Sequence, residues 1–161
     1  ARKEFSELML SYIDLLNTSW DESKNGLINE GLDMLERRIL ERREKAAIYI
    51  DLLKKTDLVP IDMSEGSVPW RSVFRLDGIN WREQYEISEE IRKYGIDVSN
   101  WYIPSHWMIK TGSNKRIQLR NTEKLSQEIF QFWLDEKTPL SLVKKTSKIV
   151  SMVLQRGVGY A

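Results

Sequence analysis

Apolar positions at helical spacing dominate the first third of the chain. They recur every three or four residues over 5–16 and again over 27–55, which predicts two helices, the second of them long. The stripe of the long helix consists of Ile28, Leu32, Leu35, Ile39, Ala46, Ile50 and Leu53. Its opposite face is dense with charge between residues 36 and 44. That pattern is typical of a solvated face with i,i+4 ion pairs, and also fits a helix that packs on a partner domain.

Strand-like alternation replaces helical spacing after residue 57. The run 58–62 contains Pro60, which predicts an edge strand or an extended linker. The run 68–76 alternates and predicts a strand with two distinct faces. One face carries Val68, Trp70, Ser72, Phe74 and Leu76, and the other carries Arg71, Val73 and Arg75.

Short helices and strands are predicted to follow one another over the rest of the chain. A helix over 81–94 ends before Gly95, and a short strand follows over 96–101. A loop covers 102–108, and Asn121 or Thr122 caps the next helix, which includes Leu125, Ile129 and Phe130. A strand over 132–134 precedes a last helix that begins at Thr138 and Pro139. The order predicts an α+β fold with a helical arm over 1–57 and a small domain over 58–161.

Composition narrows the function classes. The 161 residues suffice for one domain, or for one domain with an arm. Twenty-five basic residues against 24 acidic ones give a net charge of +1, which argues against nucleic acid as a partner. The absence of cysteine excludes disulfides and thiolate metal sites. No stretch is apolar enough to cross a membrane, so we expect a cytoplasmic protein without a membrane partner.

Motifs that would identify chemistry on their own are missing. The sequence has no Gly-rich phosphate loop. His106 is the only histidine, so a metal site with several imidazole ligands is excluded, and no nucleophile elbow accompanies it. The carboxylates form no recognisable catalytic pair. We therefore assign no catalytic residue and no metal ligand from the sequence.

Three stretches, taken in order, resemble the DegT/DnrJ/EryC1/StrS group of sugar aminotransferases. The first is Phe5-Ser6-Glu7-Leu8, followed by an arginine-rich helix that ends in Ala46-Ala47-Ile48-Tyr49. The second runs from the helix end at Tyr94-Gly95-Ile96 through a strand to Tyr102-Ile103-Pro104-Ser105-His106. The third is a helix from Thr122, a short strand ending at Leu134 and a terminal helix after Thr138.

This resemblance covers nearly the whole chain, but only the C-terminal portion of such an enzyme. It implies a long helical arm and a small domain with a short, mostly antiparallel sheet covered by helices. The complete enzyme would be a homodimer that uses pyridoxal phosphate (PLP). It would transfer an amino group from an amino-acid donor such as glutamate to a keto-sugar nucleotide. Its large N-terminal domain, which holds the cofactor lysine, would be missing here, so we expect no catalysis by this chain alone and assign no cofactor-binding residue.

The sequence also departs from the family pattern. The family's Asn-x-Arg-Met run before Ser-Glu-Leu, which assists the neighbouring subunit's active site, is replaced here by Arg2-Lys3-Glu4-Phe5. Residues 21–31 resemble an insertion in the arm.

Five residues are candidates for substrate contact. By resemblance, His106 would face the sugar or the nucleotide. Tyr102 and Trp107 could stack on a sugar ring or a base, or could be ordinary hydrophobic contacts. Arg71 and Arg75 share one strand face, where planar guanidinium groups could hold a carboxylate or a phosphate, or could simply be solvated.

The alternatives to an aminotransferase portion are a non-catalytic ligand-binding module and a dimerisation module built on the long helix.

Overall fold

The computed structural model describes residues 25–62, 64, 66–100, 103–107 and 118–156. The chain divides into two compact units, Ala1–Glu36 and Arg37–Ala161. In the first unit the structure describes α2 (Asn25–Asp33) and the first residues of α3 (Leu35–Leu53). The single long helix predicted over 27–55 is therefore wrong in one respect, because it is interrupted at Met34. Gly31 and Asp33, two weak helix formers, precede this interruption.

The second unit contains a three-stranded antiparallel sheet in the order β1-β2-β3. Its strands are β1 (Leu58–Pro60), β2 (Arg71–Leu76) and β3 (Ile129–Trp133). Pro60 lies in the edge strand β1, as its missing N–H requires. The small antiparallel sheet and its helices confirm the predicted α+β class.

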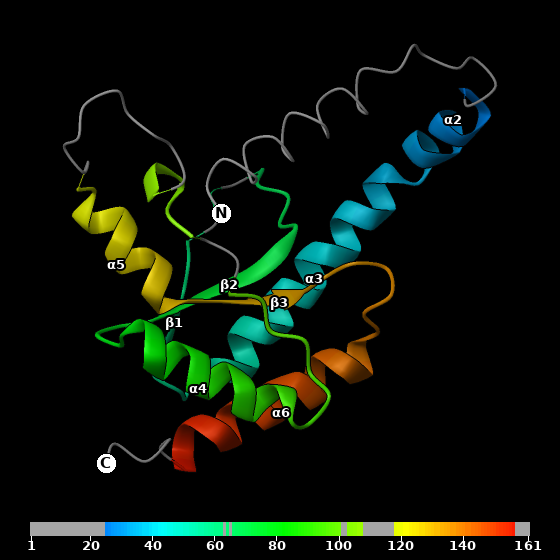
Figure 1. Ribbon diagram of the computed structural model, residues 1–161. Helices are drawn as coiled ribbons and strands as arrows, with labels where there is room; N and C mark the ends of the chain where they lie inside the picture. Colours follow the sequence, from blue (N-terminus) through cyan, green and yellow to red (C-terminus); the bar gives the residue numbers. More distant parts are fainter. Residues whose placement is uncertain (1–24, 63, 65, 101–102, 108–117, 157–161) are drawn as a thin grey trace. The chain divides into compact units, whose positions relative to one another are not determined.

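One face of the sheet packs against three helices, α3, α4 (Trp81–Arg92) and α6 (Leu140–Arg156) (Figure 1). Strand β2 supplies Ser72, Phe74 and Leu76 to this inner face, in the alternation that the sequence predicted. Aromatic and aliphatic side chains from the three helices complete the core, among them Tyr49, Leu53, Ile87, Ile91, Val143, Val150 and Val153. Burial of this apolar surface is the main stabilising contribution.

Tyr49 connects helix α3 to the centre of this core. Its ring stacks on Phe132 with the centroids 5.4 Å apart, and its hydroxyl hydrogen-bonds with Thr146 of α6. Burial raises the pKa of Tyr49 to about 12, because a phenolate in this apolar setting would lose its hydration. Helix α3 is thus an integral part of the compact unit from its middle onward.

Helix α4 has clear start and stop signals. The Asn80 side chain accepts hydrogen bonds from the N–H groups of Arg82 and Glu83, and the Glu83 carboxylate accepts from the Asn80 N–H, which completes a capping box. Gly95 adopts a φ of 74° beyond the helix end, the left-handed conformation for which glycine is favoured. The predicted helix end is confirmed.

A buried glutamine ties α4 to the junction between α5 (Arg120–Glu128) and β3. The side-chain amide of Gln84 donates to the carbonyls of Ser126 at 3.1 Å and Ile129 at 2.7 Å. Gln84, Ser126 and Ile129 are only 1%, 5% and 8% exposed, so little solvent could replace a lost donor. This interaction orients the start of β3.

The structure corrects several predictions of local structure. Val68 and Trp70, which were predicted to lie in the strand on the face of Ser72, Phe74 and Leu76, precede β2 and are exposed. Ile129 and Phe130 begin β3 instead of ending a helix, and neither Asn121 nor Thr122 caps α5, whose N-cap position is Leu119. Within 96–100, the described part of the predicted strand, the pairing is an isolated bridge between Ser99 and Gln131. No helix in the described ranges is long and apolar enough to span a membrane.

We expect Gln84→Met to lower the free energy of unfolding by about 1–3 kcal/mol, because two buried carbonyls lose their donor. Gln127→Met is the matched control, since within the described part of the chain the Gln127 side chain bonds only the Glu123 carbonyl, one turn away in α5. That control should cost about 0.5 kcal/mol or less. Urea unfolding measures the free energy of unfolding of both variants. Equal decreases would show that the two Gln84 hydrogen bonds contribute no more to stability than the single bond of Gln127.

Candidate functional site: the outer face of the sheet

The face of the sheet opposite the core, called the outer face below, carries the predicted arginines. The register places Arg71 opposite Trp133, Val73 opposite Gln131, and Arg75 opposite Ile129. Because side chains alternate along a strand, all six project from the same side. The prediction that Arg71 and Arg75 share a strand face is therefore confirmed by the register.

Arg71 stacks on one indole ring and lies near a second. Its guanidinium carbon lies 3.5 Å from the centroid of the Trp133 ring and 5.2 Å from that of Trp70. A cation over an indole face is attracted by the ring quadrupole. The stacking fixes the plane of the guanidinium without using its N–H groups, so the group is oriented by the rings and its donors stay available.

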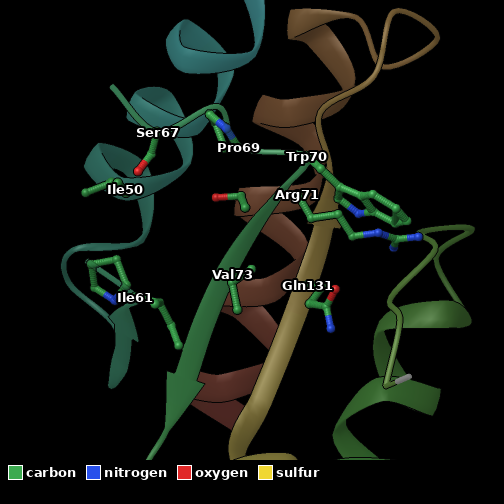
Figure 2. Close-up of a pocket in the computed structure, with 10 residues that line it drawn as sticks. Ile50, Ile61, Ser67, Pro69, Trp70, Arg71, Val73 and Gln131 are labelled. Atoms are coloured by element: carbon green, nitrogen blue, oxygen red, sulfur yellow. The ribbon is translucent and has the colours of Figure 1, made fainter. Parts of the chain in front are cut away.

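Two cavities share this part of the outer face. The first has a volume of about 280 Å³ and lies between the loop before β2 and helix α3, with Ile50, Ile61, Pro69 and Val73 in its wall (Figure 2). The second has about 580 Å³ and is lined by Arg92, residues 97–100 and Trp133. Trp70, Arg71 and Gln131 line both cavities. Figure 2 shows the side chains of Trp70 and Arg71 extending from the start of β2 across the neighbouring strand, with Gln131 farther along that strand.

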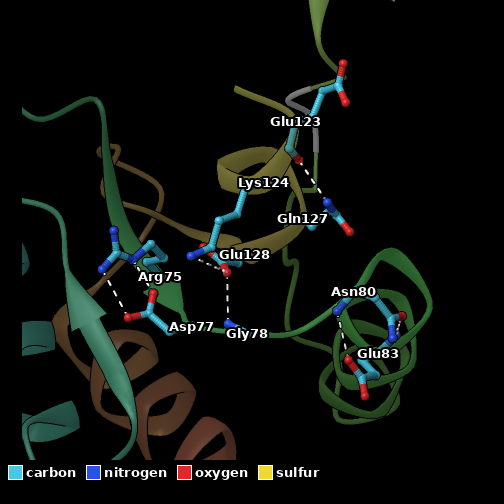
Figure 3. A network of polar contacts seen from close by, with 9 residues as sticks. All are labelled: Arg75, Asp77, Gly78, Asn80, Glu83, Glu123, Lys124, Gln127 and Glu128. Atoms are coloured by element: carbon cyan, nitrogen blue, oxygen red, sulfur yellow. Dashed lines mark hydrogen bonds and ion pairs between the residues drawn. The ribbon is translucent and has the colours of Figure 1, made fainter. Parts of the chain in front are cut away.

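Arg75 has a different environment, although it lies on the same strand face. Its guanidinium pairs with Asp77, with Nη2 donating to Oδ2 at 3.1 Å. In the polar network next to this pair, the buried carboxylate of Glu128 accepts from the Gly78 N–H at 2.8 Å and lies 3.8 Å from the Lys124 ammonium (Figure 3). Arg75 thus belongs to the turn between β2 and α4 and does not line either cavity.

His106 and Trp107 lie in a short 3-10 helix, Ser105–Trp107, that attaches to α5. The Nε2 atom of His106 lies 2.8 Å from Oε1 of Glu123, and the Trp107 indole N–H donates to the same oxygen at 3.3 Å. Trp107 also packs on Trp81 with ring centroids 6.0 Å apart. The hydrogen bond with His106, together with smaller contributions from Trp107 and the Leu119 backbone, lowers the pKa of Glu123. These contacts hold the loop on α5.

The five predicted contact residues therefore do not form one cluster in the described structure. Arg71 lines the cavities, Arg75 pairs at the β2–α4 turn, and His106 with Trp107 binds α5. Tyr102 lies outside the described residues, as do Arg2–Phe5 of the N-terminal motif. Substrate contact by any of the five stays a prediction.

The sequence reasoning missed most of the cavity wall. The alternation predicted that Trp70 shares a strand face with Ser72 and Phe74, and it gave no indication of Trp133, Gln131, Ser99 or Asp97 as lining residues. The one local signal was the pair Trp70-Arg71, an aromatic side chain next to a cation. The decisive partner, Trp133, is 62 positions from Arg71 and becomes its neighbour only through the strand register.

The described residues offer no fitting site for a metal or for a lysine-bound cofactor. They contain no group of three or more histidine or acidic side chains close enough to hold a metal ion. Lys45 is the one buried lysine among them, and its ammonium donates to the Asp135 carbonyl at 2.7 Å. That hydrogen bond joins α3 to the turn before α6, so Lys45 has a structural role.

The lowered pKa of Glu123 predicts a specific acid sensitivity. The ionised carboxylate is favoured in the folded state, so its stabilisation is complete above the ordinary pKa of 4.5 and is lost as the pH falls through the lower folded value. Glu123→Gln should therefore flatten the decline of stability below pH 4.5. The unfolding temperature, measured between pH 3 and 7, reports this decline. Glu83→Gln is the control, because Glu83 is also an acidic residue in the first turn of a helix. An unchanged acid decline in Glu123→Gln would contradict the prediction.

No protein-family model and no curated protein matches the sequence. Solved structures do match, among them a Streptococcus pneumoniae protein described as a sugar aminotransferase, Spr1654, in its PMP form. The chains are 18% identical, with a TM-score of 0.68 over 78% of this chain and 33% of Spr1654. A DegT DnrJ EryC1 StrS aminotransferase from Brucella abortus matches with a TM-score of 0.62 and 16% identity, over 78% of this chain and 33% of its own. DesI, determined in the presence of its TDP-sugar product, matches with a TM-score of 0.66 and 14% identity, over 78% of this chain and 33% of its own.

The chain spans about a third of the length of these structures. At 14–18% identity the likeness concerns the fold, and it leaves the residues of the site to be interpreted from this chain. The resemblance predicted from sequence is confirmed at that level. The chain has the fold of one portion of the sugar aminotransferases.

Proposed function

We propose that this chain is the C-terminal portion of a PLP-dependent aminotransferase that acts on a keto-sugar nucleotide. The observation that carries the proposal is the fold shared with Spr1654, the Brucella abortus aminotransferase and DesI, at TM-scores of 0.62 to 0.68 over 78% of this chain. The order of the sequence motifs supports the same assignment. In this proposal a large domain precedes the segment, two subunits pair, and the enzyme works in the cytoplasm.

The substrate class is supported by the nature of the structural neighbours. Spr1654 is described as a sugar aminotransferase, and DesI was determined with a TDP-sugar product. In this chain, the loop that contains His106 and Trp107 is the proposed contact for the sugar nucleotide, and Tyr102 is a further proposed contact residue. Its attachment to α5 through Glu123 would hold such a contact in a fixed position.

Catalysis is proposed to require the large domain. PLP acts as an electron sink and needs a lysine to hold it together with a carboxylate partner for its ring nitrogen. The buried lysine that the structure describes, Lys45, donates to a backbone carbonyl, and the other lysines of the described segments are exposed. The residues of this chain would therefore contribute to binding and positioning the substrate, while the bond-making groups come from the large domain.

Borohydride reduction of the complete holoenzyme tests where the cofactor is attached. Reduction fixes the cofactor on its lysine, and peptide mapping then identifies that residue. We expect the label on a lysine outside these 161 residues, and Lys45→Met should leave the labelling intact. A label on Lys45 or on any other lysine of these 161 residues, or failure of the complete protein to bind the cofactor, would overturn the proposal.

A second prediction concerns His106 in the complete enzyme. His106→Ala should reduce turnover of the sugar nucleotide about tenfold or more, the effect of misplacing a substrate contact. Cofactor absorbance should be unchanged. Glu123→Gln is the comparison variant, because it loosens the same loop but leaves the imidazole in place. If both variants lower only thermal stability and turnover is unchanged, His106 has a purely structural role.

A further inference from the structure

Three residues that line the larger cavity each carry a buried polar atom with no partner among the described residues. The Nη1 atom of Arg71, the Nε2 atom of Gln131 and the Oγ atom of Ser99 are all buried, and none of them makes a hydrogen bond. All three residues line the cavity of about 580 Å³. A buried polar group without a partner costs about 1–3 kcal/mol, so three around one cavity indicate that something else satisfies them.

The three groups are hydrogen-bond donors held in place by the fold. Gln131 is only 2% exposed and Ser99 only 7%, and the Ser99 N–H bonds to the Gln131 carbonyl at 3.4 Å. Arg71 is stacked on Trp133 and makes no ion pair with any residue that the structure describes. A guanidinium, an amide and a hydroxyl around one cavity suit a ligand that accepts hydrogen bonds.

The charges around the cavity leave one cation available. The guanidinium of Arg92 donates to the Val98 carbonyl and to Glu89, both at 2.6 Å. The carboxylate of Asp97 accepts from the Trp133 indole at 2.5 Å. Arg71 is thus the unpaired charge, and a single cation beside a carboxylate favours a monoanion over a doubly charged phosphate.

The shape of the wall favours a planar anion with an apolar body. The edge of a guanidinium can form two parallel hydrogen bonds with a carboxylate. Trp70, which is 62% exposed, and Trp133 supply flat apolar surface next to Arg71. Aromatic rings of this kind would pack on the hydrocarbon part of the ligand.

We propose that this cavity binds the carboxylate group of a small organic acid. Arg71 forms the ion pair, Gln131 and Ser99 add hydrogen bonds, and the apolar part of the acid lies against Trp70 and Trp133. This site does not depend on the aminotransferase assignment, because every group that forms it belongs to this chain and none requires the cofactor or the large domain.

Calorimetric titration of the 161-residue chain with sodium benzoate tests the site. Benzamide is the neutral probe of the same shape, and inorganic phosphate is the competing anion, all at equal ionic strength. We expect benzoate to bind at least ~10-fold more tightly than either of the other two, a difference of about 1.4 kcal/mol. Equal binding of benzamide or phosphate, or no benzoate binding at millimolar concentration, would overturn the proposal.

Two variants identify the residues, with one matched control. Arg71→Lys keeps the charge but loses the planar fork and should weaken benzoate at least ~10-fold. Arg75→Lys, on the same strand face but paired with Asp77, should leave the affinity within about twofold. Ser99→Ala removes a hydroxyl that has no partner in the protein, so it should fold normally and weaken benzoate several-fold. If Arg71→Lys does not fold, the test depends on Ser99→Ala. An unchanged affinity of Ser99→Ala for benzoate would then overturn the proposal.

Discussion

The two-residue alternation of β2 is the constraint on which the structure depends. Ser72, Phe74 and Leu76 must face the helices to complete the core, so Arg71, Val73 and Arg75 must face the other way. A slip by one residue would bury two arginines and expose Phe74, which is prohibitively costly. Burial of apolar side chains on the inner face thus determines which side chains lie on the outer face. The position of Arg71 at the cavities follows from the packing of the core.

Elements with a strong local signal could be predicted from the sequence, and elements buried on both sides could not. The alternation in β2, the capping of α4 and the glycine after it all follow local rules. Strand β3 is different, because Ile129, Phe130, Gln131 and Phe132 are all buried. A short apolar run without alternation fits a buried strand or a helix end equally well, so its start was misplaced.

The candidate site shows the same limit more sharply. Residue types and the shared face of Arg71 and Arg75 were predictable, but their separate environments were not. Trp133 and Asp77 decide whether each guanidinium stacks beside a cavity or pairs in a turn, and only the strand register brings Trp133 to Arg71. The bond between His106 and Glu123, 17 residues apart, likewise joins a loop to a helix without any pattern in the sequence.

A shared fold and a shared site place different demands on a sequence. At 14–18% identity, burial and backbone hydrogen bonding are enough to maintain the architecture of the aminotransferase portion. They do not explain an amide such as Gln131, which lies 98% buried with its nitrogen unpaired and would be replaced at a gain in stability by an apolar side chain. A residue that costs stability in the isolated fold, next to a stacked guanidinium with free donors, is best understood as one half of an interaction whose other half is a ligand.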